Sequence, residues 1–134
     1  MLNADRNHDA ATPLLIVLDD DAAVCASLKF ALESEGFAVH THRSGDDLLG
    51  DASLADCACF IVDQRLPAMS GLEVVAELRK KRIAAPAILI TSQPTIMLQE
   101  RAARAGVPIV EKPLLGNGLI DRVRDLIAHA RAAH

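Results

Sequence analysis

Short apolar runs alternate with amphipathic segments along most of the chain. Residues 14–18, 58–62 and 87–90 are continuous runs of Leu, Ile, Val, Ala, Cys or Phe. Runs of this length are typical of strands that are buried on both faces of a sheet. Two further short segments, 37–40 and 107–110, complete the set of strands that the pattern predicts.

Apolar residues recur at helical spacing in the intervening segments. Asp21, Ser44 and Ser70 can each cap the N-terminus of a helix. The final helix is predicted over residues 118–132, and a short one over residues 46–49. The residues expected to face inward are Val24, Leu28, Ala31, Leu32, Leu72, Val75, Ala76, Leu78, Ile96, Leu98, Ala102, Ala103, Leu119, Val123, Leu126 and Ile127.

The alternation of strands and helices predicts an α/β fold, a doubly wound five-stranded parallel sheet with helices on both faces. In the strand order 2-1-3-4-5, the fifth strand lies at an edge of the sheet. Pro108 favours that order, because proline lacks an amide donor and is found on edge strands. Residues 1–12 are mostly polar and are expected to form a flexible leader, followed by one domain over residues 13–134.

Composition narrows the classes of function. The chain has 134 residues, a net charge of −4 and only three aromatic residues, all Phe. This balance argues against direct nucleic-acid binding, which uses basic surfaces and stacked rings. We find no signal peptide and no apolar run long enough to span a membrane. The three cysteines lack metal or redox spacing and are expected to be buried thiols, so a cytoplasmic protein without a membrane partner is predicted.

Polar residues follow the predicted strands at the sheet edge where functional groups collect. Asp19 and Asp20 follow the first strand, and Asp63 follows the third. Thr91 and Lys112 follow the fourth and fifth strands. Converging carboxylates repel one another unless a cation lies among them, and hard oxygen ligands favour Mg²⁺. Because a lysine and a threonine hydroxyl suit a phosphoryl group, the sequence predicts a site for Mg²⁺ and a phosphoryl group.

Each of these residues also has a structural explanation when it is taken alone. Asp19 and Asp20 could belong to a capping cluster with Asp21, and Asp63 could be a cap or turn residue. An Asp19-x-Asp21 pair would also suit a Mg²⁺-dependent phosphatase, but Ala23 stands where such an enzyme usually has Thr or Val. The placement of all the groups at one end of one sheet is what favours a site.

A second set of potential metal ligands lies near the second strand. His40 and His42 are two residues apart, so they share one face of a strand. No third ligand is evident in the sequence, and a half-exposed strand end is expected rather than a metal site.

The candidate site residues fall into the motifs of a known family. The matching stretches are Asp19-Asp20-Asp21, Asp63-Gln64-Arg65-Leu66-Pro67-Ala68-Met69-Ser70-Gly71, Thr91-Ser92 and Lys112-Pro113. Together they resemble the receiver domain of bacterial two-component response regulators, and the resemblance covers residues 14 to about 130. It implies a flavodoxin-like receiver fold.

The resemblance implies a role for each site residue. Asp63 would accept a phosphoryl group from a sensor histidine kinase or a phosphotransfer protein in a Mg²⁺-dependent reaction. Asp20, Asp63 and the backbone carbonyl of Arg65 would bind Mg²⁺ directly, and Asp19 would bind it through water. The peptide bond between Lys112 and Pro113 is expected to be cis. The residues that would contact the phosphoryl oxygens are Thr91 and Lys112.

The resemblance also implies a signalling module that switches its interaction with a downstream output, rather than a turnover enzyme. Receivers often associate through the fourth helix, fifth strand and fifth helix, so a homodimer through that face is one expectation. The family usually has Tyr or Phe on the fifth strand, where this chain has Ile109, and Gln64 follows the acceptor where Leu, Val or Tyr is usual. The alternative is a receiver-fold interaction module that signals without phosphorylation.

Overall fold

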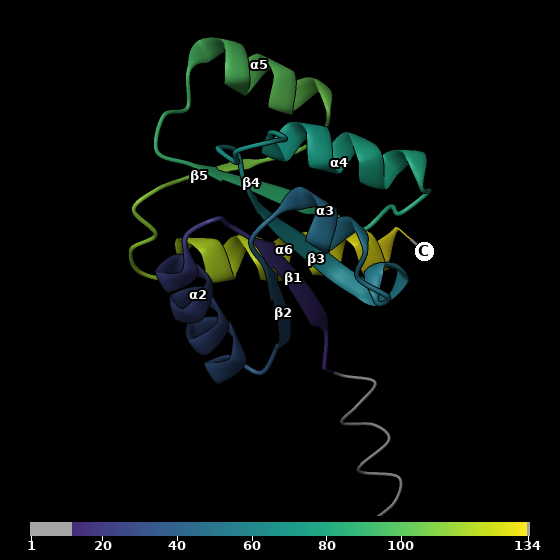
Figure 1. Cartoon of the computed structure of the whole chain (residues 1–134). Helices are drawn as coiled ribbons and strands as arrows, with labels where there is room; N and C mark the ends of the chain where they lie inside the picture. The colour runs from purple at the N-terminus through teal and green to yellow at the C-terminus, as the bar shows by residue number, and fades with distance from the viewer. Residues whose placement is uncertain (1–11, 134) are drawn as a thin grey trace, which may run out of the picture.

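A computed structural model describes residues 12–133 of the chain (Figure 1). Within these residues, five parallel strands form one sheet in the order β2-β1-β3-β4-β5, which confirms the predicted topology. The expected leader lies outside the described residues except for Thr12. The strands are β1 (Leu14–Leu18), β2 (Ala38–His42), β3 (Cys57–Asp63), β4 (Ala87–Thr91) and β5 (Ile109–Glu111).

Helices cover both faces of the sheet. They are α2 (Ala22–Ser34), α3 (Gly45–Leu49), α4 (Gly71–Lys80), α5 (Ile96–Arg104) and α6 (Gly118–Ala132), with a 3-10 turn at Leu54–Asp56. Helices α3, α4 and α5 lie on one face of the sheet, and α2 and α6 lie on the other (Figure 1). Their apolar side chains form a separate core on each face. None of the helices in residues 12–133 is long and apolar enough to cross a membrane.

Alternate residues of the central strands enter two separate cores. Ile16 and Phe60 belong to the core under α4 and α5, whereas Leu15 and Ile61 belong to the core under α2 and α6. Because strand side chains alternate between faces, a strand that is buried on both faces must be apolar throughout. The buried set also contains the three cysteines, which are free thiols as expected: Cys25, Cys57 and Cys59.

Side-chain caps determine where the helices begin, as predicted. Asp21 and Ser44 each accept a hydrogen bond from a first-turn amide, at 2.8 and 3.1 Å. Ser70 and Glu73 form a reciprocal capping box at the start of α4, with distances of 3.2 and 2.8 Å. These caps hold the first turns of α2 and α4 close to the ends of β1 and β3.

The inward faces of three helices differ in part from the prediction. Cys25 and Val74 are buried in α2 and α4 although the pattern did not select them. Alanine carries too little apolar surface to decide which side of a helix turns inward. Because α5 covers the short edge strand, only its residues Leu98 and Ala102 are buried. The residues wrongly predicted to face inward, all exposed, are Ala31, Ala76, Ile96 and Ala103.

The fifth strand begins later than predicted. Pro108 was expected inside the strand, but β5 begins at Ile109 and Pro108 lies directly before it. The Pro108 carbonyl accepts a hydrogen bond from the Leu89 amide at 2.9 Å, so proline still pairs with β4 through the one backbone group it can offer. β5 is the edge strand, as predicted. The missing amide of proline is tolerated at such an edge.

Candidate functional site

Three carboxylates meet where β1 and β3 end. The two strands are neighbours, and Leu18 at the end of β1 pairs with Val62. Asp19 and Asp20 follow β1, and Asp63 is the last residue of β3. One carboxylate oxygen from each of these three residues lies within 4.8 Å of the other two. The structure therefore brings together the three acids that the sequence selected.

Both oxygens of the Asp19 carboxylate already have donors. Asp19 is fully buried, and its Oδ1 accepts a hydrogen bond from the Asp21 amide at 2.9 Å. Its Oδ2 accepts one from the Lys112 ammonium at 2.9 Å. Asp20 is exposed instead, and its backbone carbonyl accepts two hydrogen bonds from Arg43 at 3.1 and 3.0 Å. The two neighbouring acids thus differ in burial and in free ligand atoms.

Lys112 connects the two buried carboxylates. Its Nζ lies 3.6 Å from Asp63 Oδ1 in addition to its contact with Asp19. Burial and the charge of Asp19 raise the pKa of Asp63, and the charge of Lys112 opposes this rise. Burial alone would lower the pKa of Lys112, but its hydrogen bond to the Asp19 carboxylate and the charge of Asp63 raise it overall. The Lys112–Pro113 peptide bond is cis, as expected.

Thr91 ends β4, the strand next to β3, and Arg65 follows Asp63 by two residues. Thr91 is buried at the end of β4, and its Oγ1 accepts a hydrogen bond from the Gln93 amide at 3.2 Å. The Arg65 amide donates to Asp63 Oδ1 at 3.3 Å. The Arg65 side chain donates to Gln93 Oε1 at 2.9 Å, so it links the loop after β3 to the loop after β4. All the residues that the sequence placed at this edge are therefore found around Asp63.

Gln64 and Gly71 are two structural supports that the sequence did not identify. Gln64 Oε1 accepts a hydrogen bond from the Leu72 amide at 3.0 Å, and its backbone carbonyl accepts one from Gly71 at 3.1 Å. A Cβ on Gly71 would lie 2.5 Å from the Asp63 carbonyl oxygen, so only glycine fits here. The residue after Asp63 thus holds the start of α4 against the pocket. The polar residue at position 64, noted as unusual, was the available signal.

The donor set of the pocket suits a hard divalent cation. Three carboxylates face one ammonium group, so the site carries an excess of negative charge. Carboxylate, carbonyl and water oxygens are the ligands that Mg²⁺ prefers. Within residues 12–133, this is the single group of three or more acidic, histidine or cysteine ligands that is close enough to hold an ion.

His40 and His42 have a common partner that the sequence did not reveal. Asp51 Oδ2 accepts hydrogen bonds from His40 Nδ1 at 3.0 Å and from His42 Nε2 at 2.7 Å. Asp51 follows α3, so the three side chains connect the outer edge of the sheet to the end of that helix. The expected half-exposed strand end is confirmed, since His40 is exposed and His42 half-buried, and Asp51 is a third partner that the sequence did not show. The cluster is a hydrogen-bonded bridge and not a metal constellation.

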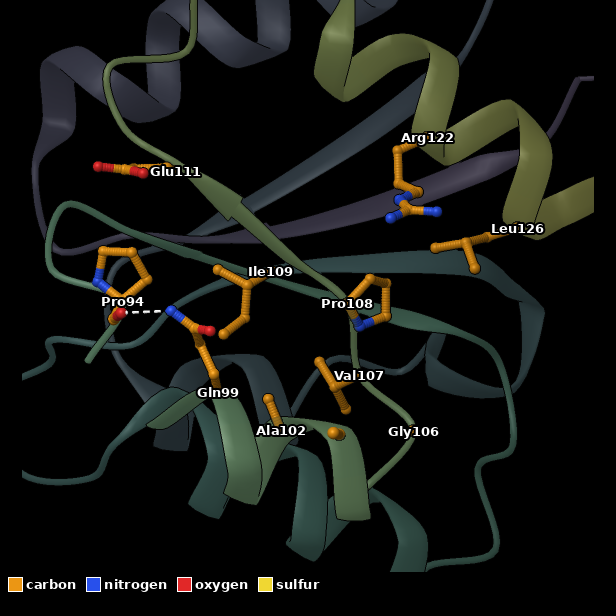
Figure 2. Close-up of a pocket in the computed structure, with 11 residues that line it drawn as sticks. Pro94, Gln99, Ala102, Gly106, Val107, Pro108, Ile109, Glu111, Arg122 and Leu126 are labelled. Carbon is orange, nitrogen blue, oxygen red and sulfur yellow. Dashed lines mark hydrogen bonds between the residues drawn. The ribbon is translucent and has the colours of Figure 1, made fainter. Parts of the chain in front are cut away.

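Ile109 stands where the resemblance leads one to expect an aromatic side chain. In Figure 2 its side chain points from β5 toward Gln99 of α5. A groove of about 630 Å³ lies beside it, between α5 and α6. Gln99 donates a hydrogen bond to the Pro94 carbonyl at 2.7 Å across this face (Figure 2). The small side chain at position 109 therefore lies beside an open groove on the outer edge of the molecule. The residues that line the groove include Ala102, Val107, Pro108, Arg122 and Leu126.

The strand order and the acidic pocket facing a lysine define an α/β domain with a charged site at the carboxyl edge of its sheet. The profile of the response regulator receiver domain family matches residues 15–124. The chain therefore belongs to the response regulator receiver domain family, as the sequence motifs indicated. Receiver domains act in signal transduction by two-component systems.

The chain is also similar in sequence to curated transcriptional regulatory proteins. The chain is 35% identical over 115 residues to the C4-dicarboxylate transport transcriptional regulatory protein DctR of Rhodobacter capsulatus, which covers 84% of this chain and 58% of the relative. It is 37% identical over 109 residues to the transcriptional regulatory protein FixJ of Azorhizobium caulinodans, covering 81% and 52%. The chain thus spans a little over half the length of these relatives.

Solved structures confirm the fold. A CheY-like receiver domain protein from Methanospirillum hungatei has a TM-score of 0.84 at 22% identity and covers 92% of this chain and 100% of its own. The response regulator StyR has a TM-score of 0.80 at 31% identity and covers 92% of this chain and 64% of its own. These neighbours share the CheY-like receiver fold that the strand order defines.

Proposed function

We propose that Asp63 accepts a phosphoryl group from a phosphohistidine of a sensor histidine kinase or a phosphotransfer protein. The reaction is Mg²⁺-dependent, and the phosphorylated domain changes its interaction with a downstream output. One observation carries the proposal: the nearly buried Asp63 carboxylate lies beside the second buried carboxylate, Asp19, and 3.6 Å from the Lys112 ammonium. Such a carboxylate is positioned to act as a nucleophile, and the neighbouring ammonium can stabilise the negative charge of a transferred phosphoryl group.

The proposed transfer is a substitution at phosphorus. An oxygen of Asp63 attacks the phosphorus, the bond between phosphorus and the histidine nitrogen breaks, and its electron pair stays on the imidazole. The product on this chain is an acyl phosphate. The Lys112 ammonium compensates negative charge on the transferred group, and the Thr91 hydroxyl donates a hydrogen bond to a phosphoryl oxygen. The Arg65 amide, which donates to Asp63 Oδ1 at 3.3 Å, favours the ionised nucleophile.

Mg²⁺ is the cation that we assign to the pocket. Asp20, Asp63 and the backbone carbonyl of Arg65 would bind it directly. Asp19 would bind it through water, which agrees with an Asp19 carboxylate whose two oxygens already accept hydrogen bonds. When bound, the ion neutralises the carboxylates and the charge of the transferred group. The chain acts in this proposal as a cytoplasmic signalling module, not a turnover enzyme.

We further propose that α5, β5 and α6 form a homodimer interface. The groove beside Ile109 lies on this face, and Ile96 and Met97 at the start of α5 are 76% and 72% exposed. Exposed apolar residues beside an open groove are typical of association surfaces. Sedimentation with and without beryllofluoride, which mimics the phosphoryl group on Asp63, tests this proposal. We expect association to increase with beryllofluoride, and an unchanged monomer in both conditions would contradict the interface.

The second candidate function is interaction without phosphorylation. It is favoured by Ile109, because this chain lacks the aromatic side chain expected to respond to the site. In that case, wild type and Asp63→Asn would associate equally, and beryllofluoride would have no effect. A response that is confined to wild type would exclude it.

Phosphorylation by a small donor tests the main proposal. We expect acetyl phosphate with Mg²⁺ to add one phosphoryl group to the protein, as measured by intact mass spectrometry. Asp63→Asn should prevent the addition, because the nucleophilic oxygen is lost. Asp56→Asn, at an exposed aspartate away from the pocket, is the matched control and should be modified like wild type. An unmodified wild-type mass under these conditions would contradict the proposal.

A further inference from the structure

A basic surface lies at the C-terminal ends of α4 and α5, away from the acidic pocket. Six of the 14 arginines and lysines of the chain are found there, although the net charge is −4. The net charge and the scarcity of aromatic residues argue against nucleic-acid binding, but the sequence does contain a run of four basic residues over 79–82. The six residues, all exposed, are Arg79, Lys80, Lys81, Arg82, Arg101 and Arg104.

Half of these six charges have no structural partner among the described residues. Arg79 donates to the carbonyls of Ile83 and Ala85 at 2.7 and 2.8 Å, and Lys80 pairs with Glu77 at 3.0 Å. The charge of Arg101 acts on Glu73 across the two helices. Within the part of the chain that the structure describes, the remaining side chains form no hydrogen bond or ion pair; these are Lys81, Arg82 and Arg104.

Arg82 occupies a backbone position that favours glycine. Its φ is 62°, in the left-handed region, where a side chain costs energy that glycine avoids. The Ile83 amide donates to the Leu78 carbonyl at 3.0 Å, which closes α4 in the way that a C-terminal glycine usually does. One or two positive charges in the last turn are enough to interact favourably with the helix dipole, so the dipole does not explain an additional arginine at position 82. Because this backbone position favours glycine, an arginine here suggests that the Arg82 side chain has a functional role.

A mainly apolar groove lies along α4, with Ala105 at the end of α5 on its other side. Its volume is about 490 Å³. In α4, its lining residues are spaced three or four apart, so the groove follows that helix for two turns. Figure 1 shows the two helices lying next to each other on the outer side of the sheet. The apolar lining residues are Leu72, Val75, Ala76 and Ala105, with Arg79 and Lys80 at the rim.

We propose that this surface, the α4–α5 basic groove, binds an acidic amphipathic helix of another protein. Apolar side chains at helical spacing would enter the groove, and the acidic residues around them would meet the basic rim. A nucleic acid would use the charges but would leave the apolar floor unfilled, and the acidic remainder of the chain would repel it. The combination of an apolar floor with a basic rim therefore favours a protein segment.

The test uses a fluorescent peptide with leucines at positions i, i+4 and i+7 and glutamates elsewhere. Binding to the unphosphorylated full chain is measured by fluorescence anisotropy. We expect saturable binding that weakens about fivefold in Lys81→Glu and in Arg104→Glu. Lys29→Glu makes the same change in net charge on α2 and should leave binding unchanged. Arg82→Gly removes a charge while relieving the backbone, so it should weaken binding by about threefold without loss of fold.

The following results would contradict the proposal. The first is binding of a peptide with lysines in place of the glutamates. A single-stranded oligonucleotide that binds more tightly than the acidic peptide would overturn the proposal in favour of a nucleic-acid surface. Absence of peptide binding, or equal weakening in Lys29→Glu, would also overturn it. Because Asp63→Asn should bind the peptide like wild type, this result is independent of the proposed phosphorylation.

Discussion

Charge imbalance is the main property of the site at the scale of single residues. Two buried carboxylates, Asp19 and Asp63, share one cation, Lys112. Burial and the charge of Asp19 raise the pKa of Asp63, so the ionised form of this carboxyl is less favoured than in an exposed aspartate. Lys112 forms an ion pair with each of these two acids. Under the proposed function, we expect its charge to govern how readily Asp63 reacts.

Replacement of Lys112 by glutamine tests this dependence. Lys112→Gln removes the ammonium 2.9 Å from Asp19 and 3.6 Å from Asp63. We expect the initial rate of phosphorylation by acetyl phosphate to fall at least about tenfold, because the transferred charge loses its compensating cation. Intact mass spectrometry over time gives the rate. Lys29→Gln is the matched control on α2, and a Lys112→Gln rate equal to wild type would contradict the role.

The start of α4 is the element most closely joined to the pocket. Gln64 follows the phosphoacceptor candidate directly and accepts the Leu72 amide at 3.0 Å. Ser70 and the Gln64 carbonyl satisfy the amides of Glu73 and Gly71. A free helix end would otherwise leave these donors without partners. A change at Asp63 therefore has a short route to α4 through the adjoining residue.

The hydrogen bond from Gln64 should contribute measurably to stability. Gln64→Met keeps the length of the side chain but removes the acceptor for the Leu72 amide. We expect the free energy of unfolding to fall by about 1 kcal/mol in urea denaturation. Gln99→Met, which removes a hydrogen bond on an exposed part of α5, should cost less. Equal costs in the two variants would show that Gln64 does not support the helix.

The bridge between β2 and the end of α3 predicts a pH dependence. Burial disfavours the ionised Asp51, but hydrogen bonds from His42, the Ser53 amide and His40 lower its pKa from 3.8 to about 2. Because the folded pKa is below the unfolded one, this stabilisation is present above about pH 4 and is lost as the pH falls through about 2.

Asp51→Asn should therefore lower the free energy of unfolding by about 1 to 2 kcal/mol at pH 6, with the difference from wild type closing toward pH 2. Urea denaturation across this pH range measures it. Asp56→Asn removes an exposed acid nearby and should show no such trend. A pH-independent difference for Asp51→Asn would contradict the bridge.

Sequence patterns predicted the elements that have strong local signals. The central strands are apolar throughout because both of their faces are buried, and Asp21, Ser44 and Ser70 cap helices where expected. The face of α5 was not predictable, because Ile96 is apolar yet lies beyond the core. Asp51 was not predictable either, since its contact with the histidines depends on how the loop after α3 returns to the sheet.

The whole molecule separates its charges although its net charge is modest. Acidic groups gather at the carboxyl edge of the sheet, and basic groups gather at the opposite ends of α4 and α5. The strand endings made the acidic site predictable from sequence. The basic run over residues 79–82 is visible in the sequence, but its proximity to Arg101 and Arg104 depends on α4 and α5 lying side by side. The proposed phosphorylation site and the proposed partner-binding surface thus lie at different ends of the domain.

The location of the added phosphoryl group tests the central claim most directly. Wild-type protein is treated with acetyl phosphate and Mg²⁺, reduced with borohydride to mark the acyl phosphate, digested, and mapped by tandem mass spectrometry. We expect the mark on Asp63, because both oxygens of Asp19 accept hydrogen bonds, whereas the contacts of Asp63 with the Arg65 amide and Lys112 both involve its Oδ1. A mark on Asp19 or Asp20, or no mark in protein that remains folded, would contradict the account.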